Sequence, residues 1–168
     1  MRLRSAILGT VIFFFAMPAI VAGAVPLWIS GARLPAPFPG HGLMMAAGAV
    51  LIVAGLAGLI VAFAQFAIEG RGTPAPVAPT ANLVVRGLYR YVRNPMYVAV
   101  LAIILGQALV FASLGVLIYA AVILALVHAF VVLYEEPTLR EAHGAQYEAY
   151  AKSVRRWIPR LTPWTGQP

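Results

Sequence analysis

The residues able to do chemistry gather at two places in the chain. Two adjacent carboxylates, Glu135 and Glu136, follow a long apolar segment, and a group of arginines and tyrosines occupies residues 83–97. Carboxylates are costly inside a bilayer, so a pair at the mouth of an apolar helix indicates a function or a specific partner. Arg140 follows Glu136 by four residues, which also permits a simple paired helix end. The spacing leaves both interpretations open.

A binding site forms if the apolar residues 96–135 fold as an antiparallel helical hairpin. The Glu pair and residues 93–97 then meet at one mouth, and convergent polar groups around an apolar hollow are typical of small-molecule sites. His128 precedes Glu135 by seven residues, or two helical turns, and projects from nearly the same face. His128 is therefore a candidate base, although a lone His in a membrane helix is more often a packing residue.

The composition excludes several other kinds of site. The chain has no Cys, which excludes disulfides, thiolate metal ligands and cysteine nucleophiles. Its three histidines lack the spacing of metal ligands, so we predict no metal site.

The elements that must position these residues are membrane helices. Of the 168 residues, 62% are apolar and 10% are charged, and the mean hydropathy is +0.88. Since one crossing needs roughly 20 apolar residues, the sequence predicts an all-α integral membrane protein with about four transmembrane helices. We place them at about 6–29, 43–68, 96–112 and 115–135, with a tight turn at 113–115.

The basic residues predict the orientation of these helices. If the N-terminus is cytoplasmic, eleven of the twelve Lys and Arg residues lie inside and only Arg33 lies outside. We therefore predict cytoplasmic termini in a bacterial inner membrane, and we interpret the net charge of +7 as topological, with no nucleic-acid partner. A cleaved secretion signal is the alternative for the first helix, but its apolar run continues to Ile29.

The C-terminal segment has the pattern of an amphipathic helix. After Pro137, apolar and aromatic residues recur at spacings of three and four as far as Trp157, which predicts a helix lying on the cytoplasmic interface. We divide the chain into a two-helix scaffold, 1–68, and a catalytic region, 69–168. The sequence does not indicate an oligomeric state.

The order of the motifs between about residues 70 and 159 has a recognisable pattern. It reads Gly87-x-Tyr89, Tyr91-x-Arg93-Asn94-Pro95-x-Tyr97, an apolar hairpin, Glu135-Glu136-x-x-Leu139, Gly144-x-x-Tyr147-x-x-Tyr150 and Arg156-Trp157-Ile158-Pro159. This arrangement strongly resembles the isoprenylcysteine carboxyl methyltransferase family, whose relatives include phospholipid N-methyltransferases.

The resemblance implies an enzyme that uses S-adenosylmethionine, bound at the cytoplasmic ends of the last two membrane helices. The residues that it assigns to the cofactor are Asn82, Leu83, Val84, Tyr89, Asn94, Pro95, Met96, Tyr97, Glu135 and Glu136. It assigns Arg93 to the methyl acceptor. The family most often has His at position 94, and Asn keeps a donor and an acceptor there but cannot titrate.

The resemblance leaves the acceptor open. Prenylcysteine-specific members carry an Arg shortly before the carboxylate pair, whereas residues 129–133 are apolar here. A lipophilic carboxylate needs no base, while an amine or phenol would give His128 or a Glu work as general base. The alternatives to a carboxylate O-methyltransferase are a lipid or small-amine N-methyltransferase, and a non-enzymatic membrane subunit or transporter that retains the fold.

Overall fold

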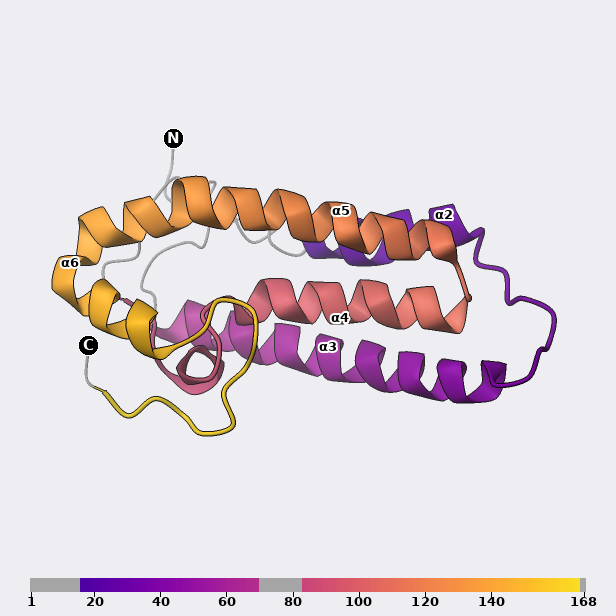
Figure 1. Cartoon of the computed structure of the whole chain (residues 1–168), viewed down its shortest axis with the longest axis horizontal. Coiled ribbons are helices and arrows are strands. Elements are labelled where there is room, and N and C mark those ends of the chain that lie inside the picture. Colours follow the sequence, from indigo (N-terminus) through magenta and orange to yellow (C-terminus); the bar gives the residue numbers. More distant parts are fainter. Residues whose placement is uncertain (1–15, 70–82, 167–168) are drawn as a thin grey trace. The chain divides into compact units, whose positions relative to one another are not determined.

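The computed structural model describes residues 16–69 and 83–166, which are helical with no strand (Figure 1). The predicted all-α fold is confirmed for these residues. The helices, in chain order, are Ala16–Ser30 (η1, Ala19–Ala24, and α2, Val25–Ser30), α3 (His41–Glu69), η2 (Gly87–Arg90), α4 (Pro95–Val110), α5 (Leu114–Phe130), η3 (Val131–Glu135) and α6 (Glu136–Ser153).

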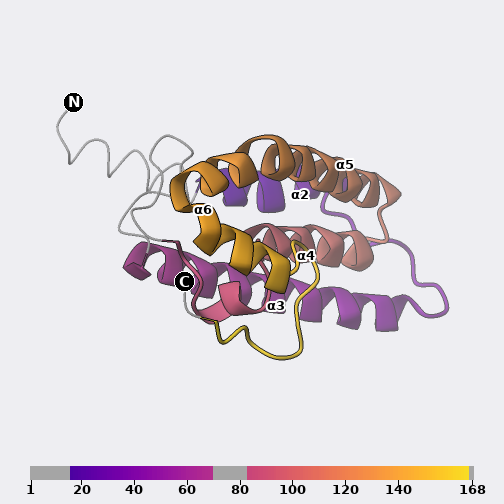
Figure 2. The same cartoon turned by 60° about the vertical axis from the view of Figure 1, so that its left-hand side comes forward.

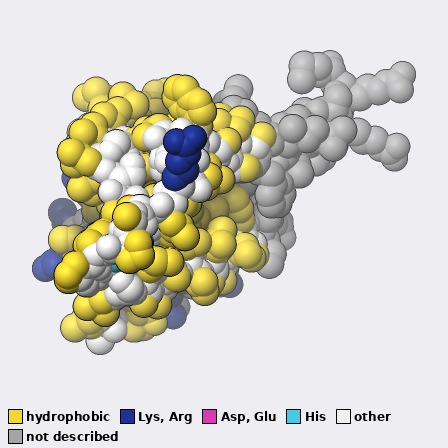
Figure 3. Space-filling view, turned by 90° about the vertical axis from the view of Figure 1, so that its right-hand side faces the viewer, with side chains coloured by type: hydrophobic (Ala, Val, Ile, Leu, Met, Phe, Trp, Pro, Cys, Tyr) yellow, Lys and Arg dark blue, Asp and Glu magenta, His cyan; other side chains and the backbone are white. Residues whose placement is uncertain are grey.

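Two of the described helices are long and apolar enough to cross a membrane. They are His41–Gln65, with a mean hydropathy of 2.5, and the run Leu114–Ser153, which is kinked at Gly144 and whose most apolar part reaches 2.8. Ala16–Ser30 and Pro95–Val110 are shorter apolar helices. Exposed apolar side chains cover much of the face drawn in Figure 3. These features fit a membrane protein, while four crossings and cytoplasmic termini stay predictions.

The predicted helix boundaries are close to those of the structure. Segments 43–68 and 96–112 correspond to α3 and α4, and the tight turn lies at 111–113, slightly before the predicted one. Helix α5 begins where it does because the Ser113 hydroxyl accepts a hydrogen bond from the Val116 N–H at 3.3 Å. The start of the predicted helix 6–29 lies outside the described residues.

The chain divides into two compact units, and the first contains Met1–Leu56 and Ala99–Leu124. Within it, α3 and α4 lie side by side (Figures 1 and 2) and touch through glycines. A Cβ atom on Gly48 would lie 2.5 Å from the Gly106 carbonyl oxygen, and one on Gly106 would lie 2.6 Å from that of Gly48. Close backbone approach of this kind replaces hydrophobic driving force between helices in lipid.

A proline in the first helix is accommodated by side chains of the same unit. Pro26 has no backbone N–H. In an α-helix this N–H would donate to Ala22 O, and in a π-helix it would donate to Val21 O, so neither carbonyl oxygen receives it. Gln107 of α4 donates to Ala22 O at 2.5 Å, and Tyr119 of α5 donates to Val21 O at 3.0 Å. The buried Gln107 is thereby satisfied and holds the first helix in place.

Candidate active site

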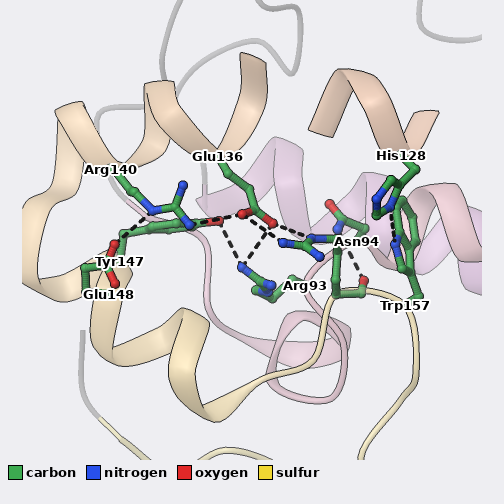
Figure 4. Close-up of polar contacts among 9 residues, drawn as sticks. Arg93, Asn94, His128, Glu136, Arg140, Tyr147, Glu148 and Trp157 are labelled. Atoms are coloured by element: carbon green, nitrogen blue, oxygen red, sulfur yellow. Dashed lines mark hydrogen bonds and ion pairs between the residues drawn. The ribbon is translucent and has the colours of Figure 1, made fainter. Parts of the chain in front are cut away.

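The second unit, Ala57–Val98 and Ala125–Pro168, contains all the predicted site residues that the structure describes. Asn82 lies outside the described residues. The polar side chains come from the residues just before and at the start of α4, from the end of α5, from η3 and α6, and from the tail after Ser153 (Figure 4).

Glu136 is the centre of a charge cluster. Its side chain is only 4% exposed and lies among three guanidinium groups. The Oε1 atom is 2.6 Å from Arg156 Nε and 3.2 Å from Arg93 Nη1, and Oε2 is 3.1 Å from Arg140 Nη2. Arg156 Nη2 also donates to Oε2 at 3.1 Å. The carboxylate therefore links α4, α6 and the tail through charge-assisted hydrogen bonds.

The surrounding charges, more than burial, determine the pKa of the Glu136 carboxyl, which lies after the apolar part of its helix. Burial alone would raise the pKa of Glu136, but the hydrogen bond from Arg156 and the charges of Arg93, Arg156 and Arg140 hold the pKa below its ordinary value. The hydrogen bond to Glu136 likewise raises the pKa of Arg156. Glu136 is consequently a permanent anion at neutral pH.

Arg93 has one buried donor without a partner among the described residues. Its Nη1 contacts Glu136 and also donates to the Tyr147 hydroxyl at 3.2 Å. Its Nε is buried and has no partner among the described residues. Because an unmade hydrogen bond on a buried charged donor is costly, this N–H is a candidate position for a bound acceptor atom.

Glu135 has different surroundings from its neighbour, because consecutive helical residues point about 100° apart. Tyr97 donates its hydroxyl to Glu135 Oε2 at 3.2 Å. The half-buried side chain makes no ion pair with the described residues. Of the two carboxylates, Glu135 is the one left able to receive a cationic or hydroxyl group.

The tail is fastened to the segment before α4 by backbone hydrogen bonds. Arg93 N donates to Arg155 O, Arg160 N to Tyr91 O, and Trp164 N to Arg90 O, each at 2.9 Å. The buried Asn94 adds its side chain, whose Nδ2 donates to Arg156 O at 3.2 Å. Asn94 thus sets the backbone from which Arg156 reaches Glu136.

A small hydrophobic core supports this fastening. It consists of Val85, Tyr147, Tyr150 and Val154, with Leu83 packed against it, and the Tyr150 hydroxyl donates to Tyr89 O at 2.6 Å. Val84, Tyr89 and Pro95 are also buried, and Met96 is half-buried.

The loop that leads into this core depends on a glycine. Gly87 has a φ of +54°, a left-handed conformation that favours Gly. The Leu88 N–H donates to the Gln65 side chain of α3 at 3.0 Å. The amide of Gln65 lies where a Cβ atom on residue 87 would be, so a side chain at this position would clash with it.

His128 is tied to the tail by Trp157. The Trp157 indole N–H donates to His128 Nδ1 at 3.1 Å, and the two ring centroids lie 6.0 Å apart. The Tyr97 ring lies 6.5 Å from that of Trp157. Since indole nitrogen only donates, Nδ1 is the acceptor and the neutral ring carries its proton on Nε2. His128 can act as a base at Nδ1 only after this bond breaks.

The sequence matches the phospholipid methyltransferase family over residues 43–146, which is more than half of the chain. The chain belongs to this family. A search of curated proteins gave no match. Membership confirms the predicted relationship and the assignment as a membrane methyltransferase. The matched region includes α4, α5, the Glu pair and most of α6.

Two members of the cluster around Glu136 had no role assigned from sequence. Arg156 and Tyr147 belong to quoted motifs, but they follow Arg93 by 63 and 54 positions, and no spacing rule connects residues so far apart. The Glu136–Arg140 pair, in contrast, is the paired helix end that a four-residue spacing allows. The signal available in the sequence was that arginines outnumber the nearby carboxylates, which indicates that one carboxylate binds more than one arginine.

Proposed function

We propose that this protein transfers a methyl group from S-adenosylmethionine to a lipophilic acceptor at the mouth formed by Arg93, Tyr97 and Glu135. The cofactor supplies an electrophilic methyl group on a sulfonium centre. The observation that carries the proposal is the combination of a carboxylate with spare acceptor capacity, Glu135, and a buried N–H without a partner, Arg93 Nε, in a member of a methyltransferase family.

The residues fit such a cofactor with a division of roles. S-adenosylmethionine carries an ammonium group, ribose hydroxyls and a sulfonium, and an accessible carboxylate suits each of these. We assign that role to Glu135, with Asn94, Pro95, Met96 and Tyr97 as the adjoining wall. Leu83, Val84 and Tyr89 contribute the buried support beneath it. Glu136 has both oxygens engaged by arginines, so its role is to hold Arg93 and Arg156.

A carboxylate is the first candidate for the acceptor. It is ionised at neutral pH, so it needs no base and only has to be aligned with the methyl group. Arg93 orients it through Nε while Glu136 and Tyr147 hold Nη1 from the other side. The occupied Nδ1 of His128 favours this candidate, because a base is then unnecessary.

A phospholipid amine is the second candidate, favoured by the description of the matched family. An ammonium group must lose a proton before it attacks, and Glu135 or a released His128 would accept that proton. Either acceptor would enter from the bilayer, and the cofactor from the cytoplasm. We extend the proposal to a bacterial inner membrane, with residues 1–68 as scaffold and 69–168 as the catalytic region.

Calorimetry with S-adenosylmethionine on the purified full chain tests the proposal. Loss of a charged hydrogen bond costs about 1.5–3 kcal/mol, so Glu135→Gln should weaken binding by at least about tenfold. Glu141→Gln is the matched control, since Glu141 is an exposed carboxylate on α6 without an ion pair to the described residues. Failure of the wild-type chain to bind would refute the proposal.

Product chemistry separates the two acceptors. Transfer of a labelled methyl group to a membrane lipid extract should give a product from which mild base releases labelled methanol if it is a methyl ester. A label that is not released as methanol and stays on a phospholipid headgroup favours the phospholipid amine.

A further inference from the structure

The tail after α6 presents apolar side chains that the second unit leaves uncovered. Leu161 is fully exposed, at 101%, and Ile158 is 61% exposed, although both belong to a segment held by backbone hydrogen bonds. Large apolar side chains held outward on an ordered segment mark an interaction surface.

Three cations, Lys152, Arg155 and Arg160, lie within nine residues of these two side chains along the sequence. Lys152 and Arg155 are exposed and have no acidic partner among the described residues. Arg160 lies between Ile158 and Leu161 and donates to Ser153 O at 2.8 Å, which keeps it at the end of α6. The sequence has no acidic residue after Glu148. We call Lys152, Arg155, Ile158, Arg160 and Leu161 the tail surface.

The tail is hydrogen-bonded to the residues that immediately precede α4. Arg155 O accepts from Arg93 N, and Arg156 O accepts from Asn94, immediately before the apolar helix α4 begins at Pro95. Trp164, further along the tail, lies with its ring centroid 5.4 Å from that of Tyr150 of α6. The tail is therefore anchored at the point where α4 would leave the hydrocarbon.

We propose that the tail surface docks on anionic phospholipid, with Ile158 and Leu161 inserted among the acyl chains and Lys152, Arg155 and Arg160 contacting the phosphates. The charge is complementary to an anionic leaflet, and the apolar side chains match the boundary between headgroups and chains. A soluble acidic partner fits less well, because it would leave Leu161 without an apolar environment. This inference is independent of the proposed methyl transfer.

Fluorescence from a label on the tail tests the docking. The chain has no Cys, so Leu161→Cys accepts a single environment-sensitive fluorophore. The full chain is placed in nanodiscs of phosphatidylcholine alone or of phosphatidylcholine mixed with phosphatidylglycerol. We expect blue-shifted emission that spin-labelled acyl chains quench and aqueous iodide does not, with the larger effect in the anionic nanodiscs.

Charge removal supplies the decisive comparison. Each cation near an anionic surface contributes about 1 kcal/mol, so Lys152→Gln with Arg155→Gln should lower the inserted-to-free ratio by roughly thirtyfold in phosphatidylglycerol. Arg33→Gln, a cation of the 31–40 loop in the first unit, is the control and should leave the ratio unchanged. Iodide quenching in both nanodiscs would overturn the proposal. Equal insertion in both compositions, unaffected by the double substitution, would also overturn it, because the cations would then have no part in choosing the lipid.

Discussion

Replacement of Glu136 by Gln should destabilise the second unit more than any other single carboxylate change. Gln has the same size but no charge, so it leaves Arg93, at 11% exposure, and Arg156, at 30%, without their shared anion. Removing one partner of a buried ion pair costs about 3–5 kcal/mol. Because Arg156 reaches water in part, we expect the low end, about 3 kcal/mol.

Thermal unfolding of the purified chain in mild detergent measures this effect. For a chain of this length, about 3 kcal/mol corresponds to a melting temperature lower by roughly 6–12 °C. Glu148→Gln is the matched control, because Glu148 also lies on α6 and binds Arg140 at 2.9 Å, but both of those side chains are nearly half exposed. We expect little change there. If the two variants melt at the same temperature, Glu136 is not the centre of the cluster.

Three further predictions test other parts of the molecule. Arg93→Lys keeps the charge of the side chain but loses its planar fork. We therefore expect kcat/KM in a methyl-transfer assay to fall by roughly 10²-fold, with the affinity for S-adenosylmethionine unchanged. A wild-type rate would mean that Arg93 serves only as an anchor. Gln107→Leu removes the amide that donates to the Ala22 carbonyl, so the free energy of unfolding in detergent should fall by about 1–3 kcal/mol. An unchanged free energy of unfolding would mean that water takes the place of the amide. For topology, a Cys at Gly40 should react with an impermeant reagent from the periplasm and one at Gln167 should not; the reverse pattern contradicts the charge-based orientation.

Much of the fold could be predicted because lipid imposes simple rules on sequence. Long apolar runs bounded by charges or prolines place α3 and α4 to within two residues. Gly48 of α3 meets α4 through Gly106, as is typical of small residues at helix contacts in lipid. The partnership of Gln107 with the first helix was not predictable, because it depends on a carbonyl freed by a proline far away in sequence.

The site could be predicted as a neighbourhood but not as a set of bonds. Arg93, Tyr97 and the Glu pair lie in one compact unit, which agrees with the single site that the order of the motifs and the resemblance implied. Sequence did not separate the two carboxylates, since adjacent residues of one type are equivalent until their partners are known. The structure differentiates them through Arg156 and Tyr97, which bind Glu136 and Glu135 respectively.

The placement of the Glu pair follows from how the chain accommodates Pro137. A proline permits a new helix start or a kink, yet the helix continues from α5 into α6 through the wide π-helical turn η3. The Glu136 N–H bonds to Val131 O, five residues back, and Pro137 stands directly after this turn with no N–H to satisfy. The first helix uses the same solution, with η1 ending two residues before Pro26. A π turn holds more residues per turn than an α turn, so it changes the phase of every later side chain. The two-turn spacing between His128 and Glu135 therefore does not align them as an α-helix would, and each has a partner of its own, Trp157 for His128 and Tyr97 for Glu135.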